Sequence, residues 1–156
     1  MTPAIELATK YKVAFTVHQY QHNSKAESYG DEAAVSLGAD PKQVFKTLVV
    51  ELNSGELAVG VVPVSGSLNL KAIANAANAK KAAMADKLKV QRSSGYVLGG
   101  VSPIGQRKPL TTIIDSSANN FSTIFVSAGK RGLEIELSAS DLANLTSATF
   151  APISAS

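Results

Sequence analysis

A glycine-rich stretch at residues 93–106, SSGYVLGGVSPIGQ, is the part of this sequence whose composition most directly suggests chemistry. It holds four of the eleven glycines in the chain, together with Pro103. Glycine lets a backbone approach a ligand closely, and proline stiffens a turn. Such a loop offers backbone N–H groups that can hold a carbonyl oxygen, an oxyanion or a phosphate. A tight turn between two elements is the common alternative.

Lys46 is the first side chain to consider as a functional group. It lies in FKTLVVEL, residues 45–52, whose aromatic and β-branched residues predict a strand. Alternation puts Lys46 on one strand face with Leu48 and Val50. If that face is the core, a lysine points toward it, and buried lysines are rare unless they are paired or functional. If the opposite face is the core, Lys46 is solvated, and the pattern leaves both possibilities open.

The other titratable residues give weaker patterns. His18 and His22 are four residues apart, but they span a strand end and a polar loop without a third ligand, so we expect no metal site and no cofactor. Glu134 and Glu136 share one strand face, either as an acid–base pair or, more commonly, as an exposed polar face. No histidine lies in a context that would activate a serine, so a serine-type hydrolase is poorly supported.

Composition limits the class of protein. With 156 residues, 45% apolar and 17% charged, the chain is expected to form one globular domain, residues 1–156. Cysteine is absent, which excludes disulfides and thiolate sites and is compatible with a cytoplasmic protein. The N-terminus lacks the apolar core of a signal peptide, and no run reaches transmembrane length, so no membrane association is expected.

Basic residues outnumber acidic ones only slightly, 15 to 12, for a net charge of +3. That excess is too small to diagnose nucleic-acid binding. The basic residues do cluster along the chain, and such clusters can attract a polyanion, although scattered surface lysines are common. The clusters are Lys80-Lys81, Lys87, Lys89, Arg92, Arg107-Lys108 and Lys130-Arg131.

The elements that must position these residues are short. Helices are predicted after Thr2-Pro3 and over residues 31–37, 70–77, 86–92 and 141–145. Strands are predicted over residues 13–17, 45–52, 57–64, 80–84, 110–115, 123–127 and 133–137. Ser67 is the predicted cap of helix 70–77, and Asp40 is predicted to open one further helical turn. Short strands mixed with short helices favour an α+β fold with a curved, mostly antiparallel central sheet.

Five stretches, read in order, resemble the YbaK/EbsC family of aminoacyl-tRNA deacylases. They are GDEAA at 30–34, FKTLVV at 45–50, MAD at 84–86, SGYVLGGVSPIGQ at 94–106 and SAGKRGLEIEL at 127–137. Their order and combination are specific, and they span nearly the whole chain. Two small departures, Ala128 in place of a family glycine and Ser94 in place of a common threonine, bear on fine substrate preference more than on the activity class.

The resemblance implies a mixed sheet, partly rolled into a barrel and flanked by helices, with a pocket for an aminoacylated 3′-terminal adenosine. Lys46 is the family lysine, expected to hold the terminal nucleotide. The loop whose amides would bind the aminoacyl carbonyl consists of Gly99, Gly100, Val101, Ser102 and Pro103. Further residues are expected to line the pocket because they lie in or beside the matching stretches: Tyr20, Thr47, Ser127, Lys130, Arg131 and Glu134.

The absence of a protein nucleophile fits the implied activity. The cysteine thiol or the ribose 2′-hydroxyl of the substrate would attack the ester, while the protein positions it and stabilises the oxyanion. The implied substrate is tRNA for proline mischarged with cysteine, with prolyl-tRNA synthetase as a transient partner. Alanine or another small residue is an alternative, because the difference is one of pocket size. A module that binds a nucleotide or RNA end without turnover is a second alternative.

Overall fold

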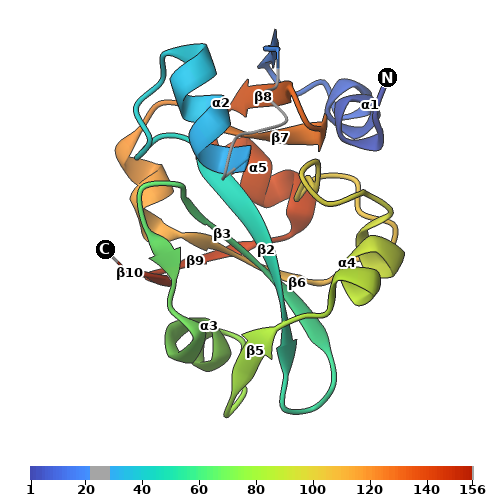
Figure 1. The fold of residues 1–156 in the computed structure, drawn as a ribbon, viewed down its shortest axis with the longest axis vertical. Helices are drawn as coiled ribbons and strands as arrows, with labels where there is room; N and C mark the ends of the chain where they lie inside the picture. Colours follow the sequence, from blue (N-terminus) through green and yellow to red (C-terminus); the bar gives the residue numbers. More distant parts are fainter. Residues whose placement is uncertain (22–28, 156) are drawn as a thin grey trace.

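The computed structural model describes residues 1–21 and 29–155 and is a mixed α+β fold (Figure 1). The helices are α1 (Pro3–Lys10), α2 (Tyr29–Leu37), α3 (Leu70–Ala76), α4 (Lys87–Ser94), α5 (Ala139–Thr146) and the 3-10 helix η1 (Ser116–Asn120). The strands are β1 (Phe15–Gln19), β2 (Phe45–Leu52), β3 (Leu57–Pro63), β4 (Ser67–Leu68), β5 (Ala82–Met84), β6 (Thr111–Asp115), β7 (Ile124–Lys130), β8 (Leu133–Leu137), β9 (Thr149–Ala151) and β10 (Ser154–Ala155).

The central sheet has five strands in the order β5-β2-β3-β6-β9. β2 pairs with β3 as an antiparallel hairpin around a turn that contains Gly55, while β3–β6 and β6–β9 are parallel. β3 is almost wholly buried, as expected for a β-branched strand in the middle of a sheet. The sheet is therefore mixed, as the family resemblance implied.

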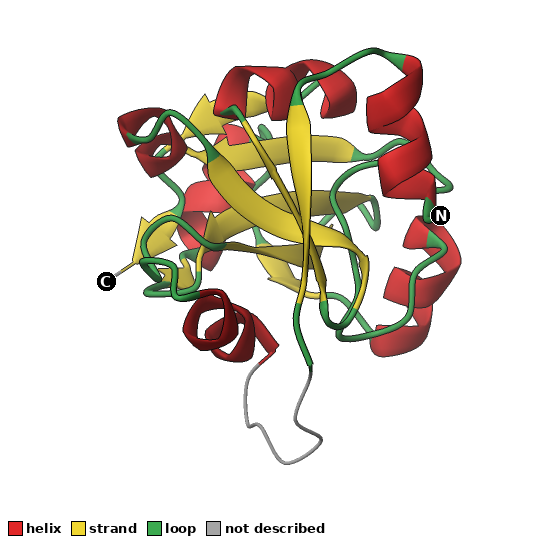
Figure 2. Cartoon of the chain, turned by 90° about the horizontal axis from the view of Figure 1, so that it is seen from above, coloured by secondary structure: helices red, strands yellow, loops and turns green. Residues whose placement is uncertain are grey.

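A second, antiparallel sheet has the order β1-β8-β7. It lies next to α1 in Figure 1 and meets the central sheet where Val44, just before β2, forms a parallel bridge with Phe125 of β7. The predicted fold class is confirmed in its mixed, mostly antiparallel pairing and its flanking helices, which lie around the strands in Figure 2. The sheets do not close into a barrel.

The buried side chains form a main core and two smaller clusters. The main core contains apolar residues of both sheets, including Phe45 and Val49 of β2 and Ile135 of β8. A second cluster packs α3 on the other face of the central sheet, around Val50 and Ile73. A third packs α2 against Val44, Val64 and Phe125, where the two sheets meet.

Two predicted helix starts are wrong. Ser67 belongs to β4, which pairs with β10, and the cap of α3 is Asn69, whose Oδ1 accepts the N–H of Ala72 at 3.0 Å. Asp40 makes a hydrogen-bonded turn, accepting the N–H of Lys42 at 2.9 Å, but no helix follows. In both places a capping side chain is present, and pairing elsewhere in the chain decides whether it starts a helix.

Other local signals hold. β2 occupies the predicted residues 45–52, Asp86 caps α4, and Ser138 caps α5 by accepting the N–H of Asp141. Gly38, which follows the last residue of α2, has a positive φ of 63°. Within the described residues no helix has the length and apolarity to cross a bilayer.

Candidate functional site

Hydrogen bonds from the side chains of Tyr96 and Gln106 support the glycine loop, residues 99–103, and its end. The Tyr96 hydroxyl donates to the carbonyl of Ile104 at 2.6 Å, and Gln106 Nε2 donates to the carbonyl of Ser102 at 3.0 Å. Tyr96 is only 5% exposed, and burial raises the pKa of its phenol to about 12, so it remains a donor. The sequence did not single out Tyr96, because its hydrogen bond to Ile104 forms only when the chain turns back on itself between the two residues.

Three loop amides lack acceptors among the described residues: those of Gly99, Val101 and Ser102. Gly100 donates its N–H to the carbonyl of Val97 at 3.0 Å, and Pro103 has no N–H. Gly99 has a positive φ of 89°, a conformation that favours glycine. The loop can therefore supply backbone donors to a bound oxygen, but Gly100 contributes by packing and not as a donor.

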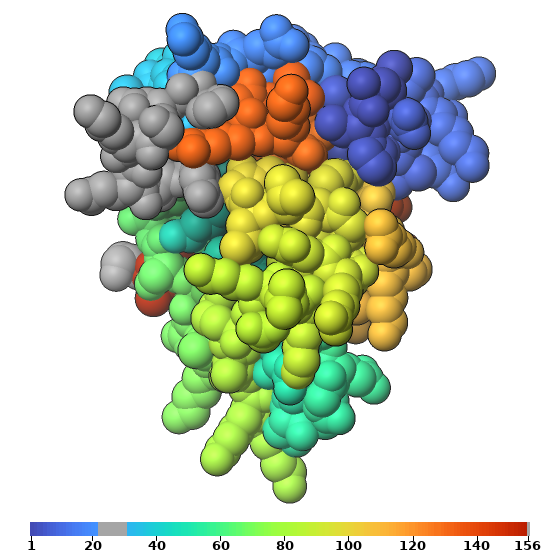
Figure 3. Space-filling view, turned by 45° about the vertical axis from the view of Figure 1, so that its right-hand side comes forward, coloured from blue at the N-terminus to red at the C-terminus, as the bar shows by residue number. Residues whose placement is uncertain are grey.

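Gly100 places the glycine loop against the turn between β7 and β8. A Cβ added to Gly100 would lie 2.8 Å from Cα of Lys130 and 3.1 Å from N of Arg131. Figure 3 shows the loop, in yellow, directly beneath the orange surface of this hairpin. The structure thus brings together two of the predicted site segments that are about thirty residues apart in sequence.

Arg131 is anchored by a buried carboxylate that sequence reasoning missed. Its Nε donates to Glu32 Oε1 at 3.1 Å, and its Nη2 donates to Glu32 Oε2 at 3.0 Å. The Glu32 side chain is 4% exposed, so the bidentate pair ties α2 to the hairpin turn. The only sequence signal was the position of Glu32 in the GDEAA stretch.

Glu134 is buried, whereas an exposed face was the more common expectation for it. Glu134 on β8 lies opposite His18 and Ser127, on the strand face away from the main core, and is 6% exposed. Its carboxyl forms no hydrogen bond or ion pair with any described residue. Burial raises its pKa to about 8, so the carboxyl is mostly protonated at neutral pH.

Tyr20 lies beside this carboxyl. Its N–H donates to the carbonyl of Gly132 at 2.9 Å, which seats it next to the hairpin turn. Burial, and then the charge of Glu134, raise the pKa of the Tyr20 phenol. Tyr20 also packs against the α2 cluster, so it joins the hairpin and α2.

Lys46 is on the sheet face that continues into this cluster. Val44 packs against Phe125 there, and Lys46 is two residues further along the same side. Ser127 is two residues after Phe125 on β7, so both side chains are on one strand face, and Ser127 lies opposite Glu134. Alternation therefore places Lys46 on the side of Val44, and Ser127 and Glu134 on the side of Phe125. Lys46 is half-buried and forms no ion pair with a described residue.

Thr47 points to the opposite face from Lys46. Its neighbours Phe45 and Val49 pack in the main core, as Val101 of the glycine loop does. The Thr47 hydroxyl oxygen is buried without a hydrogen-bond partner among the described residues. Thr47 is thus on the core side and not on the face with Glu134.

His18 forms a hydrogen-bonded pair with Glu136. Its Nε2 pairs with Glu136 Oε1 at 2.8 Å, and Thr123 donates to the other oxygen of Glu136 at 2.5 Å. The Thr123 hydrogen bond, more than His18, lowers the pKa of Glu136. No metal-binding group of three acids or histidines occurs among the described residues, and His22 lies outside them.

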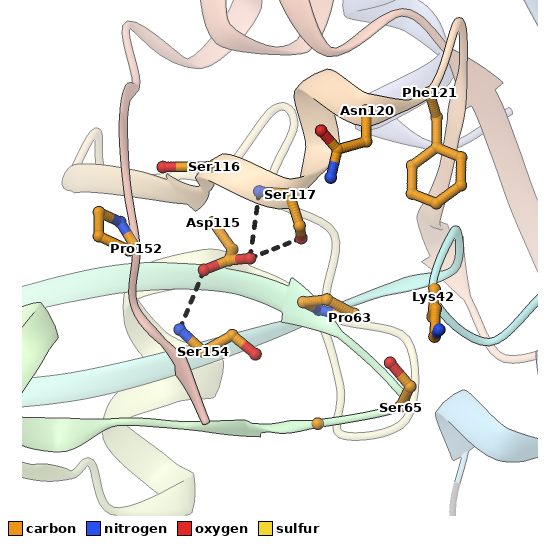
Figure 4. A pocket seen from close by; sticks show the side chains of 11 residues that line it. Lys42, Pro63, Ser65, Asp115, Ser116, Ser117, Asn120, Phe121, Pro152 and Ser154 are labelled. Atoms are coloured by element: carbon orange, nitrogen blue, oxygen red, sulfur yellow. Dashed lines mark hydrogen bonds between the residues drawn. The ribbon is translucent and has the colours of Figure 1, made fainter. Parts of the chain in front are cut away.

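A separate pocket of about 720 Å³ lies at the carboxyl ends of the parallel strands β3, β6 and β9 (Figure 4). Asp115 lines it, with Lys42, Phe121 and several serines, and none of the predicted site residues does. Both oxygens of Asp115 are occupied. Oδ1 accepts the N–H groups of Ile153 and Ser154, and Oδ2 accepts the N–H and hydroxyl of Ser117.

Comparison with known proteins gives a consistent result. A family model described as an aminoacyl-tRNA editing domain matches residues 24–145. A protein of Enterococcus faecalis, named as a candidate Cys-tRNA(Pro)/Cys-tRNA(Cys) deacylase, EbsC, is 36% identical over 152 residues, covering 97% of this chain and 92% of that protein.

Two crystal structures share the fold over essentially the full length of both chains. One, of a hypothetical protein, has a TM-score of 0.87 at 23% identity, with 99% of this chain and 100% of that chain covered. The other, of a candidate trans-editing enzyme for prolyl-tRNA synthetase, has a TM-score of 0.82 at 20% identity, with 100% and 99% covered.

Proposed function

The chain belongs to the aminoacyl-tRNA editing domain family, and we propose that it is a trans-acting deacylase that removes cysteine from mischarged tRNA for proline. The single observation that carries the proposal is the set of free amides in the glycine loop, at Gly99, Val101 and Ser102. Backbone donors fixed in a partly buried loop are suited to an oxyanion.

In the proposed reaction the substrate supplies the nucleophile. The cysteine thiol attacks the ester carbonyl carbon, the carbonyl oxygen becomes an oxyanion at the loop amides, and the bond to the ribose oxygen breaks. The ribose oxygen takes the proton that the thiol gives up, so the products are a free tRNA end and a thiolactone. The ribose 2′-hydroxyl is the alternative nucleophile.

Lys46 and Glu134 are proposed to bind the two ends of the aminoacyl-adenosine. Lys46 carries an ammonium without a partner among the described residues, which suits a terminal phosphate. Glu134 is a buried carboxyl without a cation, and the α-ammonium of the amino acid would provide one. Tyr20, Ser127, Lys130 and Arg131 are proposed to complete the pocket, whereas Thr47, on the opposite strand face, is not part of it.

The test is a charged-tRNA panel. tRNA for proline carrying cysteine, alanine or proline is incubated with the protein, and loss of the ester is followed. Cysteine should be released fastest, alanine more slowly for lack of a thiol, and proline least. Faster release of alanine would favour the alternative of an alanine deacylase, which needs no substrate thiol. A transient complex with prolyl-tRNA synthetase, also proposed, would appear as faster release of cysteine when synthetase is added.

Lys46→Ala tests the proposed role of this lysine in the same assay. It should slow release of cysteine by about tenfold to a hundredfold, the size of one charge-assisted hydrogen bond. Thermal stability should hold or rise, because Lys46 forms no ion pair with a described residue. A wild type that binds charged tRNA without ester loss would instead favour the non-catalytic binding module.

A further inference from the structure

Three basic residues from two separate segments of the chain lie together at the end of α4. Arg107 donates its N–H to the carbonyl of Ser94 at 3.0 Å, and Lys108 donates its N–H to the carbonyl of Ser93 at 2.9 Å. Both residues therefore lie against the last turn of the helix, beside Arg92. We refer to this surface as the α4 basic face; it consists of Arg92, Arg107 and Lys108.

The side chains of this face are exposed and uncompensated. All three residues are exposed, and none forms an ion pair with a described residue. Lys89, on the same helix, differs because its Nζ pairs with Glu51 Oε1 at 2.5 Å. The α4 basic face is therefore a local excess of positive charge in a chain whose net charge is only +3.

The α4 basic face is continuous with the glycine loop. The Arg107 side chain lies over Gly95, the C-cap of α4, because a Cβ added there would be 3.6 Å from Arg107 Nε. From Gly95 the chain runs directly into the loop. Figure 3 shows α4 and the loop as one yellow-green to yellow surface, with the orange hairpin above it.

Between the cations and the loop is a small exposed apolar surface. Val97 is 67% exposed and Leu98 is 40% exposed. Neither belongs to a buried cluster. Apolar and aromatic side chains beside a cationic strip are the usual setting for unpaired bases, whose faces need desolvated contacts.

We propose that the α4 basic face binds the phosphate backbone of the acceptor stem, so that the unpaired 3′ end passes over Val97 and Leu98 into the glycine loop. The proposal rests on the proposed function for its choice of RNA. A duplex backbone is a dense row of negative charge, which suits exposed arginine and lysine side chains without acidic partners. The basic face would hold the RNA, and the loop would hold the ester.

The test separates RNA binding from ester cleavage. The triple variant Arg92→Glu, Arg107→Glu, Lys108→Glu is compared with wild type in two assays. The first measures binding of uncharged tRNA for proline by fluorescence anisotropy at several salt concentrations. The second measures cleavage of 2′(3′)-O-cysteinyl-adenosine, which has no acceptor stem. The control variant Lys71→Glu, Lys80→Glu, Lys81→Glu makes the same change in charge near α3 and β5, at exposed lysines.

The triple variant should bind tRNA at least about tenfold more weakly, with a salt slope shallower by about 2 to 3, since each lost phosphate contact removes about 0.9. The control variant should bind within about twofold of wild type. Cleavage of the small ester should be unchanged. Equal loss of tRNA binding in both variants, or unchanged binding in the triple variant, would overturn the proposal.

Two further outcomes keep the inference distinct from the proposed function. If wild type binds tRNA through this face but cleaves neither substrate, the basic face stands and the deacylase proposal fails. If the triple variant loses cleavage of the small ester in proportion to tRNA binding, the face acts on the loop and the RNA inference is overturned. The neutral variant Arg92→Gln, Arg107→Gln, Lys108→Gln repeats the test without added negative charge.

Discussion

Two buried carboxyl groups in this molecule are used in opposite ways. Asp115 and Glu134 are nearly equal in exposure, at 5% and 6%. Asp115 accepts four hydrogen bonds that join β6, η1 and the start of β10. Glu134 accepts none from the described residues. A carboxyl whose acceptors are all occupied is part of the framework, whereas one without partners retains its capacity to bind a ligand.

The surroundings of the two acids differ in the same way. The pocket at Asp115 is lined by serines together with lysine, phenylalanine and proline side chains. The Asp115 carboxylate is already occupied by backbone and serine donors. The face at Glu134 adjoins Tyr20 and the Glu32–Arg131 pair. Groups without a partner among the described residues, namely Glu134, Lys46 and the loop amides, thus occur in the segments that the family resemblance singled out. A cavity by itself is a weaker guide here than unsatisfied chemistry.

The largest expected effect is on the framework acid. Asp115→Ala should lower the free energy of unfolding by about 4 kcal/mol, because several buried donors lose their acceptor at once. Deacylation per folded molecule should not change. Urea unfolding and a single-turnover assay measure the two effects. A fully stable Asp115→Ala protein would contradict this difference between the two acids. Glu134→Gln should lose little stability at pH 7.

The next effect concerns the contact between the glycine loop and the hairpin. Gly100→Val should slow deacylation by about two to three orders of magnitude, equivalent to about 3–4 kcal/mol, because its side chain would displace amides aimed at the oxyanion. Gly100→Ala should also be damaging, since even a Cβ would meet Cα of Lys130 at 2.8 Å. The measurement is the rate of ester loss at saturating protein.

Gly66→Val is the matched control in the other region. A Cβ at Gly66 would meet the carbonyl oxygen of Ala155 at 2.6 Å, so this variant also forces a backbone shift, but beside the Asp115 pocket. It should lose stability and keep its rate per folded molecule. If both glycine variants lose rate alike, the loop has no special role and the two regions do not differ as described.

The third effect is a pH dependence of stability with opposite signs at two neighbouring glutamates. The pKa of Glu134 is raised to about 8 in the folded protein, so between its unfolded value of 4.5 and about 8 the folded state holds a proton that the unfolded chain has lost. The stability contributed by this group is complete below pH 4.5 and is lost as pH rises through 8. Relative to wild type, Glu134→Gln should gain several kcal/mol of stability between pH 4 and pH 9, since each unit of pKa difference corresponds to about 1.4 kcal/mol.

Glu136→Gln is the control for that measurement. Thr123 holds the pKa of Glu136 below its usual value, so Glu136 stabilises the fold above its unfolded pKa, and this is lost as the pH falls through its folded pKa. Glu136→Gln should therefore be less stable than wild type at neutral pH and should approach wild type in acid. The difference at neutral pH should be less than about 1 kcal/mol, because the Glu136 carboxylate is partly solvated. Equal pH profiles for the two variants would contradict the assigned environments.

The sequence by itself predicted the elements whose signals are local. The run of β-branched residues in β2 predicted a strand, and helices were predicted at residues 86–92 and 141–145, close to α4 and α5. The structure shows that the caps of these helices, Asp86 and Ser138, bond to N–H groups two or three residues away. The glycine loop and Lys46 were also identifiable, because unusual composition and family motifs are properties of the sequence.

Only the tertiary structure decided which groups are left without partners. Alternation put Glu134 and Glu136 on one face, but whether each carboxyl is solvated depends on segments distant in sequence that pack around it. The same holds for Ser67, which is in a strand because β10 returns to pair with it. Burial and long-range hydrogen bonding are set by chain segments that a local pattern does not contain, and among the described residues these gave Asp115 four hydrogen bonds and Glu134 none.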